Sequence, residues 1–240
     1  MHDDDVFSPV LGRRQLLHGA TALSILGIAR LAGQRPVLRV GAAEEELDVS
    51  DLVDADRAMG MCVLTPSETE GPYYLNLNLV RSDITEGFPG VKTRLNLHVV
   101  DANDCSPLSN ARVDVWHNNA PGAYSGFANQ GTQGQTFLRG VQFTDGTGTA
   151  IFDTIYPGWY QGRTTHIHIK VQPSGGSVLT TQMYFPHGLS RRVYRIAPYA
   201  AHGQNPTQNS NDPLFLPETV LAVLGSFGGR LQLDLTIGVA

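Results

Sequence analysis

Charged residues are scarce in this sequence, and the basic ones form no cluster. Asp, Glu, Lys and Arg together make up 16% of the 240 residues, and the formal net charge is −5 at pH 7. Proteins that bind nucleic acid or another polyanion usually carry a basic patch, which shows in the sequence as grouped Lys and Arg. We therefore expect no nucleic-acid partner.

The sequence also lacks an apolar run long enough to span a membrane. The run at residues 16–29 has about 14 residues, whereas a spanning helix needs about 20. Arg13 and Arg14 stand just before this run, an arrangement that resembles a twin-arginine export signal. We predict that residues 1–43 are such a leader and that the protein is exported to the periplasm, the cell surface or the medium, without a stable membrane span. An amphipathic helix of the folded domain is the alternative.

Cysteine is almost absent, with only Cys62 and Cys105 in the chain. An even number of cysteines in an exported protein permits one disulfide. Sequence spacing cannot show whether two Cα atoms lie within bridging distance. A disulfide and two free thiols therefore both stay open.

Helical periodicity is weak after the leader, and two regions follow it. Residues 44–60 are acidic, beginning with three consecutive glutamates, which predicts a solvated linker. Residues 61–240 are predicted to form one folded domain. Apolar and polar residues alternate in short segments there, as in strands with one buried face. The clearest segments are 94–99, 113–116, 150–155, 166–171, 179–185 and 231–237.

Turn-forming Gly, Pro, Asp and Ser residues separate these segments. Short strands with such spacing favour a sandwich or a barrel. Residues 194–215 are rich in Pro, Asn and Gln and predict a long ordered loop, a feature that is often functional. We expect an all-β fold, an antiparallel β-sandwich with long connecting loops.

His166 and His168 are the first candidates for a functional site. Residues i and i+2 of a strand share a face, so both imidazoles are expected on the face opposite Ile167, Ile169 and Val171. Histidine is the commonest metal ligand among side chains. Two solvent-facing histidines without a function are the alternative.

Carboxylates are missing around these histidines. No Asp or Glu stands between Tyr156 and Thr181, which counts against an iron(II) site made of two histidines and one carboxylate. The segment offers Tyr160 instead, and a Gly- and Pro-rich loop offers Tyr124. A phenol has a reference pKa of about 10, so a strongly Lewis-acidic ion such as iron(III) is needed to bind it as phenolate near neutral pH.

Five motifs in order resemble the intradiol ring-cleavage dioxygenases, the family of the catechol and protocatechuate 3,4-dioxygenases. They are Thr69–Tyr74, Asp114–Ser125 with its Trp, His, Gly and Tyr, the Pro157-Gly158-x-Tyr160 turn, Arg163-x-x-His166-x-His168, and Thr181–Phe185. Only five residues separate Tyr160 from His166, fewer than in intracellular members. The chain is therefore similar to a compact, exported branch of the family.

The resemblance implies a role for each matching residue. Tyr124, Tyr160, His166 and His168 would hold a non-haem Fe(3+) ion, and Tyr160 would leave the ion when substrate binds. Arg163 would lie beside the substrate ring and stabilise its negative charge, and Gln182 would support it as a neighbour. The residues expected to line the substrate pocket are Pro72, Tyr73, Tyr74, Trp159 and Arg163.

The activity that the resemblance implies is oxidative ring cleavage. The expected enzyme is an exported dioxygenase that opens a small aromatic diol between its two hydroxyls with O2, giving a product of the cis,cis-muconate type. A β-sandwich module that binds phenolic or carbohydrate ligands without catalysis is one alternative. A zinc hydrolase or an iron(II) oxygenase is another, against which the two tyrosines count. The particular catechol and the oligomeric state, a homodimer included, stay open.

Overall fold

The structure of the protein is a computed structural model that describes residues 63–224 and 228–240. The predicted leader (1–43) and linker (44–60) lie outside these residues, so both boundaries stay predictions. All described residues belong to one compact unit. No helix in this described part of the chain is long and apolar enough to cross a bilayer.

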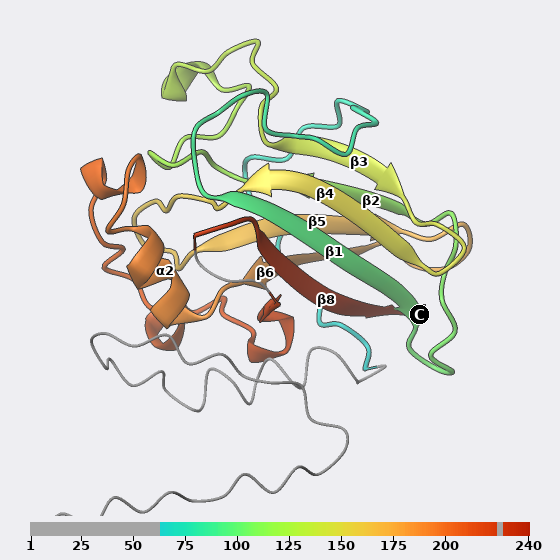
Figure 1. Ribbon diagram of the computed structural model, residues 1–240. Helices are drawn as coiled ribbons and strands as arrows, with labels where there is room; N and C mark the ends of the chain where they lie inside the picture. Colours follow the sequence, from blue (N-terminus) through green and yellow to red (C-terminus); the bar gives the residue numbers. More distant parts are fainter. Residues whose placement is uncertain (1–62, 225–227) are drawn as a thin grey trace, which may run out of the picture. The chain divides into compact units, whose positions relative to one another are not determined.

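In the described residues, eight strands form two sheets of four strands each (Figure 1). The first sheet has the order β4-β1-β8-β7, with β4 at Thr149–Ile155, β1 at Lys92–Asp101, β8 at Leu231–Val239 and β7 at Ala222–Val223. The second has the order β3-β2-β5-β6, with β3 at Arg139–Phe143, β2 at Arg112–Trp116, β5 at His166–Gln172 and β6 at Leu179–Tyr184. The predicted β-sandwich is confirmed.

One pair of strands departs from the antiparallel pattern. β1 and β8 run parallel, with Thr93 opposite Leu231 and Asp101 opposite Val239, while all other strand pairs in the described residues are antiparallel. Parallel strands need a long crossover connection, and here the second sheet supplies it. Alternation of apolar and polar residues does not distinguish the two directions, so the sequence could not predict this pair.

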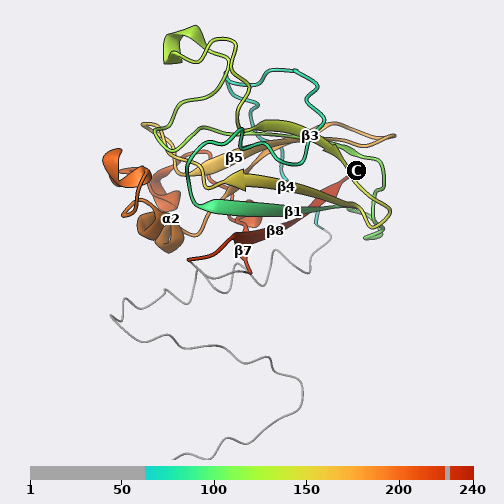
Figure 2. The ribbon, with the colours of Figure 1, turned by 45° about the horizontal axis from the view of Figure 1, so that its top comes forward.

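The core lies between the two sheets, which Figure 2 shows from a tilted view. Leu95, Leu97 and Val99 of β1 are fully buried, as the alternation predicted. Ile167 and Ile169 of β5 are also fully buried and belong to the same apolar cluster. Both strands therefore turn their apolar sets toward each other, and the polar set of β5 lies on the opposite face of its sheet.

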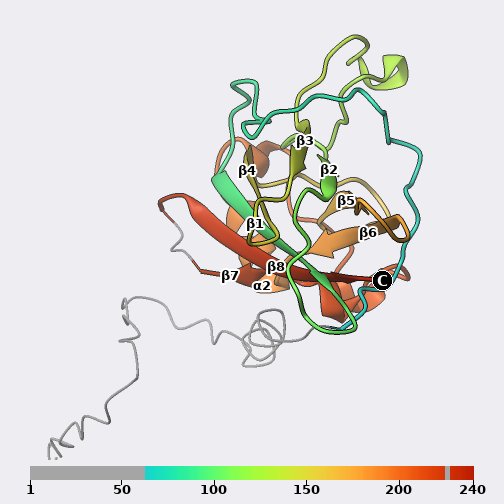
Figure 3. The ribbon, with the colours of Figure 1, turned by 90° about the vertical axis from the view of Figure 1, so that its right-hand side faces the viewer.

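That opposite face is buried too, unlike the exposed face of a simple sandwich. Residues 65–81, which we call the strap, run along this sheet (Figure 3). The strap is hydrogen-bonded at Glu68 N to Thr180 O (2.8 Å) and pairs with β3 between Val80 and Val141. It lies against His168 at Gly71, and the exposed fraction of His168 is 1%. The polar residues of this sheet thus lie in a covered layer, suited to a site.

Two strands and one α-helix of the described residues were not predicted from the sequence: β3, β7 and α2. β7 has only two residues. β3 was missed since Gly140 interrupts its pattern; a Cβ at Gly140 would lie 2.4 Å from Ile84 Cγ2, so the close packing requires glycine. The α-helix α2, at His187–Val193, has only seven residues, which is too short for a clear helical period.

Short 3-10 helices occur in the connections of the described chain. They are η1 at Ala128–Gln130, η2 at Tyr199–Ala201, η3 at Asn209–Asn211 and η4 at Pro217–Thr219. η2 and η3 lie within the predicted loop of residues 194–215, which is therefore ordered by its own turns. Cys105 is disulfide-bonded, and the other cysteine of the chain, Cys62, lies outside the described residues.

Candidate metal centre and active site

Four aromatic donor side chains converge beside β5. His166 and His168 project from β5, Tyr124 from the loop after β2, and Tyr160 from the loop after β4. The ring centroids of His166 and His168 are 4.9 Å apart, and Tyr160 lies 5.4 Å from His166. Tyr124 lies 6.2 Å from His168 and 6.0 Å from Tyr160. The structure therefore brings together the four residues expected to bind a metal.

Two of these donors have polar atoms that no other group satisfies. The Tyr124 hydroxyl and both ring nitrogens of His168 are buried without a hydrogen-bond partner in the described structure. Buried polar groups are almost always paired, because an unpaired one costs about 1–3 kcal/mol. The arrangement fits side chains that are completed by an ion.

The His166 ring is oriented by the backbone. Its Nδ1 lies 2.7 Å from Thr164 O, a carbonyl that can only accept, so Nδ1 carries the proton and Nε2 keeps its lone pair. Nε2 faces the Tyr160 hydroxyl at 3.2 Å. Burial lowers the pKa of His166 to about 3 and the pKa of His168 well below its usual value. Both imidazoles are therefore neutral and able to bind a metal.

The two phenols point to the kind of metal. Burial raises the pKa of Tyr124 well above 10 and also raises the pKa of Tyr160, so neither ionises near neutral pH without a strong Lewis acid. No three His, Cys, Asp or Glu side chains of the described residues are grouped as a metal site. A metal held by both histidines would take its further protein ligands from the phenols, and this donor set fits iron(III).

Two glycines of the sequence motifs let the loops that carry the tyrosines touch. A Cβ at Gly122 would lie 2.2 Å from Trp159 O, and a Cβ at Gly158 would lie 2.3 Å from Asn119 O. Any larger residue would force the two loops apart. Both glycines therefore set the distance between Tyr124 and Tyr160.

His117 anchors the Tyr124 loop and is not available as a ligand. Its Nε2 lies 2.7 Å from Thr154 Oγ1 and its Nδ1 2.8 Å from Asn118 O. Thr154 belongs to β4 of the other sheet. His117 thus links the start of this loop to the second layer of the sandwich.

Arg163 lies in a hydrogen-bonded network beside the donors. Its Nη2 donates to Gln182 Oε1 at 2.7 Å, and its Nε donates to Asp212 Oδ2 at 2.9 Å. Asp212 also accepts from Thr164 N at 2.7 Å, and its side chain is fully buried. Gln182 is therefore a neighbour of Arg163, and so is Asp212, which was not predicted. The sequence signal for it was its place in the polar loop of residues 194–215.

Glu68 of the strap reaches the same network through Tyr184. The Tyr184 hydroxyl lies 2.6 Å from Leu214 O and 2.9 Å from Glu68 Oε2. One hydroxyl proton cannot serve both acceptors, so a protonated Glu68 that donates to Tyr184 satisfies all three groups. Burial raises the pKa of Glu68 to about 7, in keeping with this arrangement. No local pattern in the sequence pointed to Glu68.

Only part of the strap that was predicted to line the pocket lies at the donor cluster. Tyr73 stacks on Tyr124 at 4.4 Å and meets Tyr160 edge-on at 6.1 Å. Gly71 approaches so closely that a Cβ there would lie 3.3 Å from His168 Cε1. Pro72, between them, is exposed. This part of the strap forms a wall of the donor cluster.

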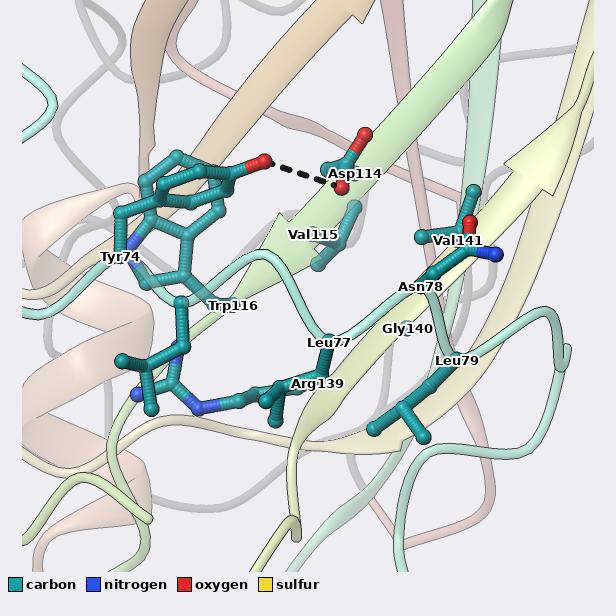
Figure 4. Close-up of a pocket in the computed structure, with 11 residues that line it drawn as sticks. Tyr74, Leu77, Asn78, Leu79, Asp114, Val115, Trp116, Arg139, Gly140 and Val141 are labelled. Atoms are coloured by element: carbon teal, nitrogen blue, oxygen red, sulfur yellow. Dashed lines mark hydrogen bonds between the residues drawn. The ribbon is translucent and has the colours of Figure 1, made fainter. Parts of the chain in front are cut away.

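Tyr74 and Trp159 have their contacts elsewhere. Tyr74 packs on Trp116 at 4.8 Å, and its hydroxyl donates to Asp114 at 3.4 Å (Figure 4). Lys170 Nζ lies 4.0 Å from the Tyr74 ring centroid. Trp159 donates from Nε1 to Gly203 O at 3.0 Å. Neither ring is in contact with the four donors in the described structure, and their predicted role in substrate binding stays untested.

A β-sandwich that carries two histidines and two tyrosines in one covered layer defines the class of this protein as a candidate phenolate–imidazole metalloenzyme. A family model described as a dioxygenase matches residues 69–190. The structure of the intradiol ring-cleavage dioxygenase from Tetranychus urticae superposes with a TM-score of 0.70 at 30% identity, covering 74% of this chain and 95% of that one. The chain belongs to the family of intradiol ring-cleavage dioxygenases.

Two sequence relatives come from Acinetobacter. The chain is 32% identical over 151 residues to the catechol 1,2-dioxygenase of Acinetobacter baylyi, a match that covers 53% of this chain and 48% of the relative. It is 31% identical over 184 residues to catechol 1,2-dioxygenase 2 of Acinetobacter lwoffii, covering 68% and 66%. The match thus spans about half the length of the first relative and about two thirds of the second.

Proposed function

We propose that this protein is a dioxygenase that opens a catechol-type ring between its two hydroxyls with O2, giving a cis,cis-muconate-type product. The observation that carries the proposal is the convergence of Tyr124, Tyr160, His166 and His168 with buried donor atoms left unpaired. The relatives named catechol 1,2-dioxygenase support it. A binding module without catalysis would leave these four donors without a role.

The proposed cofactor is a non-haem Fe(3+) ion held by these four side chains. Bound there, it would supply Lewis acidity that draws electron density from the substrate ring and prepares it for O2. Tyr124 is fully buried, whereas Tyr160 is partly exposed. Tyr160 is therefore the ligand with room to move, and its oxygen can take a proton from a substrate hydroxyl when the substrate displaces it.

Arg163 would act on the charge of the substrate ring. Asp212 and Gln182 hold its guanidinium in a fixed position, so its charge needs no rearrangement when negative charge develops on the ring. Gly71 and Tyr73 close one side of the cluster and reduce the access of water. These residues would position the ring and stabilise its charged state.

Arg81, Arg94 and Arg139 are the basic residues to weigh as clamps for a substrate carboxylate, and each already has a hydrogen-bond partner. Arg81 pairs with Glu86 (2.7 Å), Arg94 pairs with Asp153 (2.9 Å), and Arg139 donates to Ser125 (2.8 Å to Oγ). We therefore propose an uncharged catechol as substrate over a carboxylated one such as protocatechuate. Oxygen uptake should be fastest with catechol or its alkyl or chloro derivatives; faster uptake with protocatechuate would contradict this choice.

We also propose export by the twin-arginine route. The support is the Arg13-Arg14 pair before the apolar run and the disulfide at Cys105, a bond typical of oxidising compartments. Replacing both arginines by lysine should keep the protein in the cytoplasm, as measured by cell fractionation. Unchanged export of this variant would argue against the route.

One set of measurements tests the proposed iron, the ring cleavage and the role of Arg163. The purified protein should be reddish, with a broad visible band from phenolate-to-iron(III) charge transfer that shifts when catechol is added. The Arg163→Ala variant should keep iron and colour but lose most turnover, by roughly 100-fold or more, measured as O2 uptake. A colourless protein with stoichiometric zinc would refute the proposed cofactor, and iron loss in Arg163→Ala would assign the arginine a structural role.

A further inference from the structure

Arg139 is a buried cation without an acidic partner. Its exposed fraction is 4%. Its Nε donates to Ser125 Oγ at 2.8 Å and its Nη2 to Ser125 O at 2.9 Å, while Nη1 has no partner. No carboxylate of the described residues forms an ion pair with it. The protein thus keeps an uncompensated positive charge inside this sheet layer.

Such a charge is costly unless something balances it. Removing an ion from water without a partner costs several kcal/mol even after relaxation, and burial lowers the pKa of Arg139 to about 10. The group is still a cation near neutral pH. Arg163, by comparison, is balanced by the fully buried Asp212. Because Arg139 has no such partner, we expect its charge to be balanced by an anion that is not yet present in the metal-free protein.

The sheet register places Arg139 in line with a proposed iron ligand. Arg139 of β3 is opposite Trp116 of β2, Trp116 is opposite His168 of β5, and His168 is opposite Gln182 of β6. Residues directly opposite in antiparallel strands share a face, so these four form one row on the covered face. Trp116 stacks on His168 at 5.0 Å with the planes 8° apart.

The backbone that Arg139 binds belongs to the second proposed ligand loop. Ser125 directly follows Tyr124, and Ser125 Oγ in turn donates to Phe137 O at 2.7 Å. The guanidinium thus lies near Tyr124 on one side and along the row of His168 on the other. Figure 4 shows Arg139 and Trp116 projecting from adjacent strands toward the same region.

The space at Arg139 is too small for a substrate group. The cavity lined by Tyr74, Asp114, Trp116 and Arg139 has a volume of about 10 Å³, roughly that of one water. A substrate carboxylate would not fit there. Asp114, the carboxylate that lines the same cavity, is already paired with Arg112 (2.7 Å). Tyr124 is the other nearby side chain that becomes anionic in the proposed enzyme.

We propose that Arg139 is the charge partner of the Tyr124 phenolate, an inference that rests on the proposed iron site. Its positive charge lies on the Tyr124 side of the centre and is not shared with any carboxylate. Arg163, which Asp212 balances, acts electrostatically on both phenols, whereas Arg139 acts on Tyr124 and not on Tyr160. The two phenolates therefore experience different fields, and this difference favours Tyr124 as the phenolate that stays bound and Tyr160 as the one that leaves.

The test compares Arg139→Met, Arg139→Lys and Ser125→Ala in the iron-loaded protein. Loss of the cation raises the energy of the phenolate electrons, so Arg139→Met should shift the charge-transfer band to longer wavelength and lower the iron reduction potential. Arg139→Lys keeps the charge and should stay near the wild-type wavelength. Ser125→Ala weakens the same loop contact without changing charge and should leave band and potential unchanged.

Further measurements separate an effect of the Arg139 charge from a structural effect of the residue. The shift in Arg139→Met should persist in a Tyr160→Phe background, where Tyr124 is the remaining phenolate. If Arg139→Met does not fold, Arg139→Gln serves in its place, with melting temperature measured for all variants. A lower melting temperature with band and potential unchanged would overturn this inference alone, as would equal shifts in the Lys and Met variants. A wild-type protein without a phenolate band would overturn the proposed cofactor as well.

Discussion

The Tyr124 hydroxyl destabilises the metal-free protein, and the proposed iron ion would satisfy it. It is fully buried and makes no hydrogen bond with any described residue. Such a group costs about 1–3 kcal/mol. The fold tolerates this cost at a position where only a ligand can recover it.

Tyr124→Phe should therefore separate stability from metal binding. The metal-free variant should be as stable as the wild type or more stable by about 1 kcal/mol, because an unpaired hydroxyl is removed from an otherwise unchanged site. Iron content and the visible band should be lost or strongly reduced. Urea unfolding of the metal-free protein and metal analysis check both expectations. A variant that binds iron with the wild-type band would show that Tyr124 is not a ligand.

Asp212 is expected to matter through Arg163. Asp212→Asn removes the charge that balances the guanidinium and weakens the hydrogen bond to Thr164 N, so the protein should lose roughly 2–4 kcal/mol of unfolding free energy. Because Asp212 makes no contact with the four donors, iron and colour should be retained while turnover falls. Denaturant unfolding and O2 uptake measure the two effects. Unchanged turnover would show that Asp212 does not position Arg163.

At this scale, the sequence predicted the residues that lie within short motifs. Tyr124, His166 and His168 were found because a strand and a loop next to it carry them in recognisable spacing. Asp212 and Glu68 were not found, because they reach the site from segments about 49 and 116 residues away from their partners. Arg139 was not found either, because its strand β3 was missed and only the sheet register places it beside the site.

The strap is the element that converts a sandwich face into an enclosed site. It brings Gly71 against His168 and Tyr73 onto Tyr124, and Glu68 attaches it to Tyr184. Glu70 adds an ion pair with Lys170. Polar and aromatic contacts therefore hold this element in place more than an apolar core does.

Glu68 gives the strap a predictable response to pH. Its pKa is raised to about 7 by burial, so its stabilising contribution is complete below about 4.5 and is lost as the pH rises toward 7. Glu68→Gln imitates the protonated acid. At pH 8 the variant should be more stable than the wild type by roughly 1 kcal/mol, discounted for partial exposure, and at pH 5 the two should be equal. Urea unfolding at both pH values checks this; a constant difference would refute it.

Strands were predictable where apolar residues on a buried face alternate along the chain with polar residues on the other face. β1 followed this rule, with Leu95, Leu97 and Val99 inward. On β2 and β5 both faces are buried, since the strap and loops cover the second face, so alternation predicted the strands but not the covering. Gly140 hid β3, and the short α2 was invisible to periodicity.

For the whole molecule, three buried histidines control the response to acid. Burial lowers the pKa of His117 to about 4, that of His166 to about 3, and that of His168 well below 6.5. Their stabilising effect is complete above 6.5 and is lost progressively as the pH falls toward the folded pKa values, about 4 for His117 and about 3 for His166. Glu68 has the opposite effect, because its raised pKa lets the folded state bind about one proton more than the unfolded state does. Near pH 5.5, each unit by which the pH falls should therefore lower the unfolding free energy of the metal-free protein by about 2.7 kcal/mol.

Chemical unfolding of the metal-free protein between pH 5 and 7 measures this slope. The Glu68→Gln variant should have a steeper one, by about one proton, because the opposing group is removed. His117→Gln should instead have a shallower slope. It is a suitable control because His117 is not one of the four donor residues. A stability that is flat from pH 5 to 7 would show that the histidines do not differ between the folded and unfolded states.

The row of Arg139, Trp116, His168 and Gln182 also has a consequence for how the enzyme is made. Each residue comes from a different strand, so the row exists only after four strands have paired in one register, and a slip of one residue would turn His168 to the opposite face. Pairings between distant segments form slowly in β proteins. During refolding with iron present, colour should therefore appear with the last kinetic phase, later than the gain of strand signal. The iron centre would then act as a record of correct strand pairing, acquired only by chains that have finished folding.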